Sequence, residues 1–462
     1  MSRRLPTFIA FSLLATPATS AQASAADFHP TTGGKTPAAR SKGFASGEVI
    51  VKFEGQRFGR AVALPPRVGV RQAASALRRS PRVAYAVPNF IATASAKAAV
   101  AAADIPNDPG NISVPRDPPG AWVLKQWNFL PWTGMGTPEL PTSPGGIDAP
   151  GAWENLAAVG RRGAKGVTVA VLDTGIAYRA KGSRFRRSPD FASKQFVDGY
   201  DFVDEDKLPL DENGHGTHVA GTIGEKNDNG VGLTGLAFGA KLMPVRVLDR
   251  HGRGEADDIA AGIRFAASNG ADVINMSFNF GCGKAVPDID DALRLAYRRG
   301  VVTVASVGNL GSETCVSPPA TGPHVIGVGG STEGGCLGGY SLGGKGVDVV
   351  APGGGAPIVG CSSVLADPIY QVTLKAGSTR RFGIPGNYVG TSMAAAHVAA
   401  AAAMTIAAGV VGPAKKSRGR VGAVTRRLRA TARSLGLPAI QQGAGLIDLA
   451  RATDQALRGK RR

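Results

Sequence analysis

Five short apolar runs, each followed by a glycine-rich turn, constrain the fold of this chain more than any other feature of its sequence. The runs are "GVTVAVLDTGI" (166–176), "KLMPVRVL" (241–248), "ADVINMSF" (271–278), "GVVTVASVGN" (300–309) and "HVIGVGG" (324–330). They alternate with helical patterns such as "ADDIAAGIRFAASNG" and "IDDALRLAYRRG". Strands that are apolar throughout are buried on both faces, and strands that alternate with helices form parallel sheets. We therefore expect an α/β fold, a doubly wound and mostly parallel sheet with helices on both faces.

A small α+β unit is expected before this domain. The segments "GEVIVKFE" (47–54) and "VAYAVPNFIATA" (83–94) have strand patterns, and "RQAASALRRS" (71–80) has a helical one. An alanine-rich stretch, "AKAAVAAADIPNDPG", follows with the character of a linker. The chain thus has a minor unit and a major domain.

The first 25 residues have the pattern of a secretory signal peptide. Arg3 and Arg4 precede the apolar run "LPTFIAFSLLA", and "SAQASA" offers Ala-x-Ala cleavage sites that end at Ala23 or Ala25. The apolar run is too short to span a bilayer, and no other stretch qualifies as a membrane span. We expect a secreted protein, extracellular or periplasmic.

The formal charge of +19 suggests a nucleic-acid partner at first sight. The excess of Lys and Arg, however, lies in residues 1–103 and 413–462, whereas residues 104–412 carry nearly equal numbers of basic and acidic residues. We therefore expect no nucleic-acid partner.

The four cysteines are an even number in a protein that is expected to be exported, which favours two disulfides. Three pairings are compatible with the sequence. We predict Cys282–Cys315 and Cys336–Cys361, because sequential pairing closes the shortest loops. Metal binding is the alternative, but no Cys-x-x-Cys spacing supports it.

Three polar residues lie where functional groups collect in such folds, at strand and helix ends. Asp173 ends an apolar run in "AVLDTG", His215 begins a helical segment in "NGHGTHVAGTI", and Ser392 begins the alanine-rich helix of "VGTSMAAAHVA". A serine nucleophile needs a base, and a carboxylate orients that base and stabilises its charged form. Taken singly, each residue has a structural explanation as a cap, a turn or a satisfied polar group.

Taken together, the three segments resemble the active-site motifs of the subtilisin-like serine proteases, or subtilases, of the secreted bacterial type with a propeptide. The order Asp, His, Ser is that of the family. The resemblance implies a serine endopeptidase that works through an acyl-enzyme, with Asp173, His215 and Ser392 as its triad. It leaves His218 and His397 as structural residues.

The same resemblance assigns further site residues. Asn309 in "VASVGN" matches the asparagine of the oxyanion hole. The segments "GRG" and "SFN" match the two that hold the substrate, which makes Gly252, Gly254 and Ser277 substrate-binding residues. The sequence departs from the usual family pattern at Phe278-Asn279-Phe280, Val307 and Ala396.

The resemblance also implies a precursor. We expect a signal peptide (1–25), a propeptide that assists folding and inhibits the enzyme (26–103), a catalytic domain (104–455) and a basic tail (456–462). The enzyme should remove its own propeptide by a cut within Ser95 to Asp104. The expected partners are peptide and protein substrates and the propeptide, and we expect a monomer.

No cofactor is expected for the chemistry. The loop "GYDFVDEDKLPLDENG" has Asp201, Asp204 and Asp206 at a spacing similar to one calcium site of thermostable subtilases. A structural calcium ion and a solvated acidic loop are both compatible with this segment, because Leu208 and Leu210 stand where further oxygen ligands could help.

Two other functions are less compatible with the sequence. An esterase or lipase would have its serine in a G-x-S-x-G turn, whereas Ser392 lies in Gly-Thr-Ser-Met-Ala. A binding protein on an inactive protease fold would not need a full triad together with Asn309. Both alternatives are therefore less favoured than the protease.

Overall fold

The structure is a computed structural model that describes residues 43–66, 68–94, 121–134, 140–161, 163–227, 229–311, 314–412 and 415–457. The chain divides into residues 1–36 and 37–462, and every described residue belongs to the second part. The predicted signal peptide, the stretch predicted to be cut and the last five residues of the predicted basic tail lie outside the described residues.

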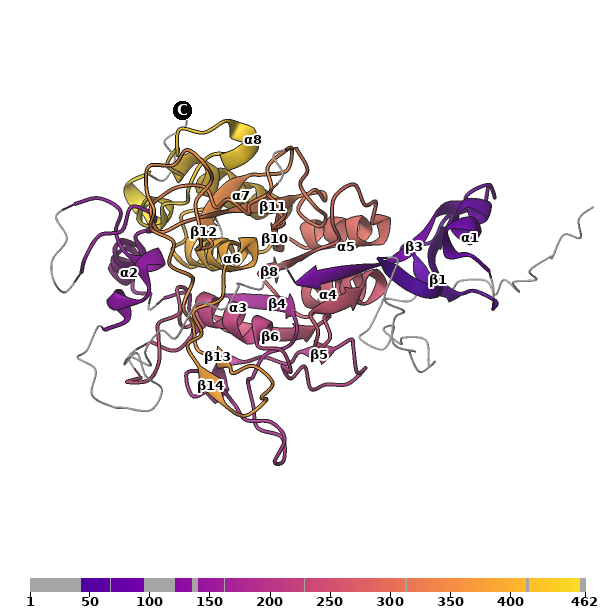
Figure 1. The fold of residues 1–462 in the computed structure, drawn as a ribbon, viewed down its shortest axis with the longest axis horizontal. Coiled ribbons are helices and arrows are strands. Elements are labelled where there is room, and N and C mark those ends of the chain that lie inside the picture. The colour runs from indigo at the N-terminus through magenta and orange to yellow at the C-terminus, as the bar shows by residue number, and fades with distance from the viewer. Residues whose placement is uncertain are drawn as a thin grey trace, which may run out of the picture. The chain divides into compact units, whose positions relative to one another are not determined.

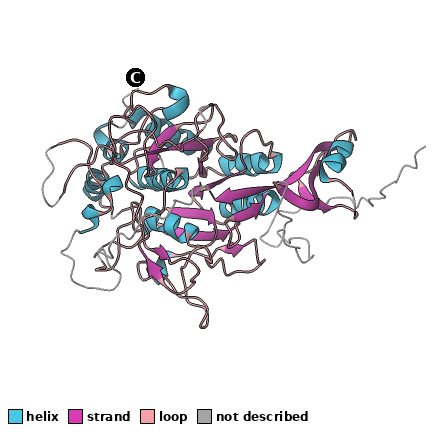
Figure 2. Ribbon diagram, viewed as in Figure 1, coloured by secondary structure: helices cyan, strands magenta, loops and turns pink. Residues whose placement is uncertain are grey.

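The major domain is built on a sheet of seven parallel strands (Figures 1 and 2). The expected α/β fold with a parallel sheet is confirmed. In spatial order the strands are β12 (Val349–Pro352), β11 (Val325–Ser331), β10 (Val302–Ser306), β8 (Val273–Met276), β4 (Thr168–Asp173), β6 (Lys241–Arg246) and β5 (Tyr200–Asp201).

Helices cover both faces of this sheet because successive residues of its strands point to opposite sides. Val169 and Val171 of β4 pack in one core with α3 (His215–Gly224) and α6 (Thr391–Ala407). Ala170 and Leu172 pack in a second core with α4 (Ala256–Ser268) and α5 (Pro287–Arg298). Residues that alternate along β4 thus serve two separate cores.

The central helix α6 is buried along almost its whole length, from Thr391 to Ile406. Its alanines leave room for the strands that pack around it, and the helix continues to Ala407, beyond the alanine run that identifies it in the sequence. Within the described residues, no helix combines the length and the hydropathy that a bilayer crossing requires.

The small N-terminal unit is α+β, as expected. It consists of β1 (Phe44–Phe53), β2 (Arg60–Ala63), α1 (Val70–Leu77) and β3 (Val83–Ala94). Its strands are antiparallel, and β3 extends the pairing to β7 (Arg253–Glu255) and β9 (Phe278–Asn279) of the major domain. The strand β3 is thus shared by the two units.

Several elements were not expected from the sequence. The strands β5 and β12 are too short to show a pattern, and the hairpin of β13 (Thr373–Leu374) and β14 (Phe382–Gly383) lies in a polar segment. The other helical elements are α2 (Ala149–Ala158), α7 (Arg418–Thr431), α8 (Ala439–Gln442), α9 (Leu449–Thr453) and the short 3₁₀ turns Ala121–Leu124, Trp127–Phe129, Ser193–Gln195 and Gln455–Leu457.

Both disulfides of the structure have the predicted pairing. Cys282 is bonded to Cys315 and Cys336 to Cys361, with Cα–Cα distances of 5.8 and 6.3 Å. The first bond joins the segment after β9 to the segment after β10, which are 33 residues apart in sequence.

We expect reduction of these bonds to lower the stability of the folded protein. Closing loops of this size contributes about 3 kcal/mol each in the chain-entropy model. The measurement is the thermal unfolding midpoint with and without reductant, in a Ser392→Ala background that prevents self-digestion. The paired variants Cys282→Ser/Cys315→Ser and Cys336→Ser/Cys361→Ser assign the effect to each bond. An unchanged midpoint in both pairs would contradict the prediction.

Candidate active site

The three residues of the expected triad lie at the ends of elements of the major domain. Asp173 is the last residue of β4, His215 the first of α3 and Ser392 the second of α6. All three are buried, and His215 Nδ1 lies 2.7 Å from Asp173 Oδ1. Gly214, which precedes His215, has φ of +103°, a conformation that glycine adopts at little cost. The turn at Gly214 therefore directs His215 toward Asp173.

The hydrogen bond to Asp173 decides which ring nitrogen of His215 can act. Because a carboxylate only accepts hydrogen bonds, Nδ1 of His215 carries the proton and Nε2 is the acceptor nitrogen of the neutral ring. Asp173 Oδ1 also accepts from the Thr174 backbone N–H at 2.7 Å, which fixes the carboxylate. The ring therefore presents a basic Nε2 at the end of the sheet.

Ser392 is tied to the segment before β9. Its Oγ donates to the Ser277 carbonyl at 2.9 Å, and Ser277 Oγ donates to the Ser392 carbonyl at 2.8 Å. The hydroxyl of Ser392 is thus held by Ser277 rather than by His215 Nε2. Hydrogen bonds between catalytic groups are often long or poorly aligned without substrate and tighten only when substrate is bound.

Asn309 contacts the first residue of α6, Thr391, although the two lie far apart in sequence. Its Oδ1 accepts from the backbone N–H of Thr391 at 2.9 Å and from the Thr391 hydroxyl at 2.8 Å. Because a backbone N–H can only donate, these contacts assign Oδ1 and so the orientation of the whole amide. The Nδ2 group, a donor, therefore points away from Thr391.

The other two histidines near the site are held as neutral, packed residues. His218 donates from Nε2 to the Ile369 carbonyl at 2.9 Å and stacks on Tyr388, and burial lowers its pKa to about 3. His397 donates from Nδ1 to the Met393 carbonyl at 2.7 Å, and burial lowers its pKa to about 4. Their contacts fit the structural roles expected for them.

Sequence reasoning missed Asp211, which organises the residues around the site. Its buried carboxylate accepts hydrogen bonds from the Thr174 hydroxyl, the Gly214 N–H and the Thr217 hydroxyl, at 2.9, 2.9 and 2.6 Å. These three residues flank Asp173 and His215. Asp211 precedes a glycine and the start of a helix, and an aspartate at such a position often accepts hydrogen bonds from backbone N–H groups. This pattern could have identified Asp211 from the sequence.

The predicted substrate-binding residues lie along the two strands that flank β3. Gly254 is in β7, where it pairs with Ala92, and Gly252 comes just before β7. Ser277 directly precedes β9. A Cβ atom on Gly254 would overlap the Val247 carbonyl oxygen, so only glycine fits there. The residues therefore border a position that an extended chain, β3, occupies.

The acidic loop, for which a calcium site and a solvated loop were both compatible with the sequence, contacts a cationic side chain of β6, Arg246. Nη1 of Arg246 donates to Asp201 Oδ2 at 2.8 Å and to Asp204 Oδ2 at 2.6 Å. Asp206 accepts from the backbone N–H of Leu208. Since the guanidinium already neutralises two of the three carboxylates, this donor set does not fit a bound calcium ion.

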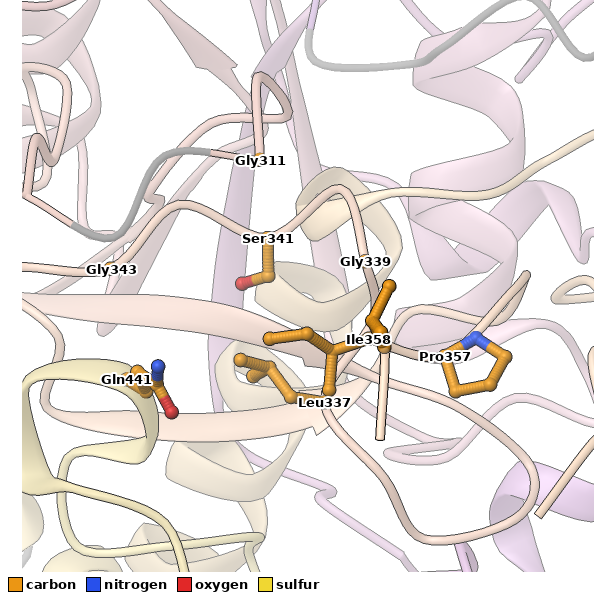
Figure 3. Close-up of a pocket in the computed structure, with 9 residues that line it drawn as sticks. Gly311, Leu337, Gly339, Ser341, Gly343, Pro357, Ile358 and Gln441 are labelled. Carbon is orange, nitrogen blue, oxygen red and sulfur yellow. The ribbon is translucent and has the colours of Figure 1, made fainter. Parts of the chain in front are cut away.

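A pocket of about 370 Å³ is lined by residues that follow Asn309 in the sequence, and it was not expected from the sequence (Figure 3). Gly311, Leu337, Ser341, Ile358 and Gln441 are among its lining residues. Among the described residues that line it, none is ionisable.

We expect activity to be lost on the acid side of neutrality through protonation of His215. Burial disfavours the charged ring, but the Asp173 carboxylate outweighs burial and raises the pKa of His215 above its ordinary value of 6.5. The neutral ring is the active form, so kcat/KM should fall as pH falls through this raised pKa. A pH profile with an uncharged peptide reporter is the measurement, and an acid limb well below pH 6 would contradict the prediction.

Comparisons with known proteins agree with this geometry. The Subtilase family model matches residues 164–443, more than half of the chain. Over 248 residues the chain is 38% identical to the "Thermophilic serine proteinase" of Bacillus sp. (strain AK1), a match that covers 54% of each protein. It is 35% identical over 288 residues to "Subtilisin BL" of Lederbergia lenta, which covers 62% of this chain and 91% of that protein.

One solved structure also resembles the chain. A protease from Pseudoalteromonas arctica PAMC 21717 matches with a TM-score of 0.56 and 30% identity, over 67% of this chain and 94% of that one. The chain spans about half the length of the first Bacillus relative. The family match across the whole site region and the identity to subtilisin BL show that this chain belongs to the subtilase family.

Proposed function

We propose that the protein is a secreted serine endopeptidase, made as a precursor that it processes itself. The observation that carries the proposal is the buried Asp173–His215 hydrogen bond beside Ser392, next to two strands that hold a third chain segment between them. Peptide substrates commonly bind proteases by adding a strand in this way.

In the proposed reaction, Ser392 Oγ attacks the peptide carbonyl carbon and its proton passes to His215 Nε2. Asp173 holds the ring and stabilises its charged form. The C–N bond then breaks, and His215 returns the proton to the leaving amine. A water molecule then attacks the acyl carbonyl carbon and gives its proton to His215 Nε2. The bond between Ser392 Oγ and the acyl group breaks, His215 returns the proton to Oγ, and the acid product leaves.

The oxyanion of each tetrahedral intermediate needs donors that are fixed in advance. The backbone N–H of Ser392, at the N-terminus of α6, is one candidate. The Nδ2 group of Asn309 is the other, since Thr391 holds the amide oxygen and sets its direction. Asn309 thus acts in the proposal as a fixed hydrogen-bond donor.

Contacts between the two units support an inhibitory role for the N-terminal unit. Lys52 forms an ion pair with Asp291 of α5 at 2.8 Å, and the Tyr85 hydroxyl donates to Asp288 at 3.3 Å. The Asn89 amide donates to Asp257 at 2.9 Å and to Glu255 at 3.2 Å. While β3 lies between β7 and β9, a substrate cannot occupy the same place.

The strand register supports a maturation site that follows β3. Thr93 pairs with Asn279 and Ala94 with Phe278. Ser277 directly precedes Phe278, and its carbonyl lies 2.9 Å from Ser392 Oγ, so the last described residue of β3 pairs with the neighbour of the residue that holds Ser392. We therefore keep the cut within the stretch Ser95 to Asp104 expected from the sequence, which follows directly on β3.

The test is expression of the wild type and of Ser392→Ala side by side in a protease-deficient host. We expect the wild type to clear casein and to have lost its N-terminal segment by a cut within the stretch Ser95 to Asp104, and the variant to do neither. A variant that is trimmed at the same place would refute self-processing. A wild type that leaves casein and an uncharged peptide intact would refute the protease.

A further inference from the structure

Two surface segments next to the candidate site carry a dense group of exposed cations, which we call the basic patch. Residues 176–188 and 375–383 contain no acidic residue. Eight exposed basic residues make up the basic patch: Arg179, Lys181, Arg184, Arg186 and Arg187 in the first segment, and Lys375, Arg380 and Arg381 in the second.

The two segments are in direct contact. The Arg186 backbone N–H donates to the Thr379 carbonyl at 3.1 Å, and the Thr379 hydroxyl donates to the Arg184 carbonyl at 2.5 Å. Within the described part of the chain, Arg184 is the one basic-patch residue with a carboxylate partner at ion-pair distance, Glu212. Most of the positive charge therefore faces solvent.

Both segments are anchored beside the catalytic candidates. The first begins three residues after Asp173, and its Ala177 N–H donates to the Thr217 hydroxyl of α3 at 2.9 Å. The second follows β13, whose Thr373 hydroxyl donates to the carbonyl of Gly214 at 2.5 Å, next to His215. In Figure 1 the β13–β14 hairpin lies beside α3. A chain that leaves the site past His215 would thus meet these segments.

A cavity of about 1060 Å³ adjoins the basic patch. Arg179 and Arg187 belong to both, and the aromatic side chains of Tyr178, Phe196 and Tyr200 form part of the cavity wall. Among the described lining residues, Arg179, Arg187 and Lys207 outnumber the one acidic residue, Asp198, so the cavity suits an apolar side chain that has carboxylates near it. Residues 104–412 as a whole are nearly neutral. Attraction of substrate carboxylates is therefore expected at the basic patch and not over the whole domain.

We propose that the basic patch binds acidic residues of the substrate polypeptide on the C-terminal side of the bond that is cut. This proposal rests on the proposed protease function. The strands β7 and β9 would hold the residues before that bond, as they hold β3. The basic patch would hold residues several positions after it, so the enzyme favours proteins with an acidic stretch there.

The test compares two peptides of equal length that share the residues around the cleaved bond. One carries four Glu residues beginning about four positions after the bond, and the other carries Gln in their place. The patch variant is Lys181→Gln/Arg186→Gln/Arg380→Gln/Arg381→Gln. The matched control is Lys165→Gln/Arg298→Gln/Arg418→Gln/Arg426→Gln, which removes the same charge from exposed positions elsewhere.

We expect the parent and the control to cleave the Glu peptide with kcat/KM about tenfold higher than the Gln peptide at low ionic strength. The patch variant should cleave both peptides at the rate of the Gln peptide. About 0.5 M salt should remove the preference in the parent, because it shortens the screening length.

The outcomes separate the two proposals. No cleavage of either peptide by the parent refutes the protease itself. Cleavage without a preference, or a preference that the patch variant keeps, refutes the role of the basic patch. Loss of binding to phosphatidylglycerol vesicles or to DNA in the patch variant, with an unchanged peptide preference, would replace the proposal with a surface-anchoring role.

Discussion

Replacing Ser392 with alanine should lower kcat by about 10⁶-fold, and replacing His215 should cost about as much, a magnitude known from subtilisin. The two residues act in one proton transfer, so the double variant should lose hardly more than either single variant. Asp173→Ala should cost less, because it removes the orientation of the ring and leaves the base in place. The measurement is single-turnover hydrolysis of an uncharged peptide ester by purified variants.

His218, which lies three residues after His215 in α3, provides a matched control for this prediction. His218 also lies in α3, but its Nε2 is bonded to the Ile369 carbonyl and its ring stacks on Tyr388. We expect His218→Gln to lower the unfolding midpoint and to retain measurable turnover. If His215→Ala stayed active while His218→Gln lost the reaction, the assignment of the base would be wrong. Circular dichroism of each variant excludes loss of fold as the cause.

Replacing Asn309 with alanine should lower kcat by about 10²–10³-fold with little change in KM, which is the range for removal of one oxyanion donor in subtilisin. A donor that meets charge only in the transition state contributes to the chemical step rather than to substrate binding. The kcat and KM values of the variant on an uncharged peptide are the measurement.

Thr391 allows the orientation of this amide to be tested separately from its presence. The variant Thr391→Val removes the hydroxyl that donates to Asn309 Oδ1 but keeps the backbone N–H on the same oxygen. We expect a smaller loss of kcat than in Asn309→Ala, because the amide remains partly held. Equal activity of Asn309→Ala and wild type would remove Asn309 from the mechanism.

The sequence by itself determined the architecture of the major domain and the candidates for its site. Runs such as "GVTVAVLDTGI" are apolar throughout, and this local pattern is compatible only with burial on both faces of a sheet. Asp173, His215 and Ser392 could be identified because each ends or begins an element with a strong local signal, and because their three segments together resemble the subtilase motifs. Sequential pairing of the cysteines also agrees with the structure, since short loops limit the distance between partners.

Only the tertiary structure decided which charges meet. Arg246 lies far along the chain from Asp201 and Asp204, so the sequence left both a calcium site and a solvated acidic loop open where the fold places a guanidinium. The register of β3 against β9 and the contact between residues 176–188 and 375–383 are also long-range. Such pairings depend on how distant segments pack, which leaves no periodic pattern in the sequence, whereas burial of a strand or helix does.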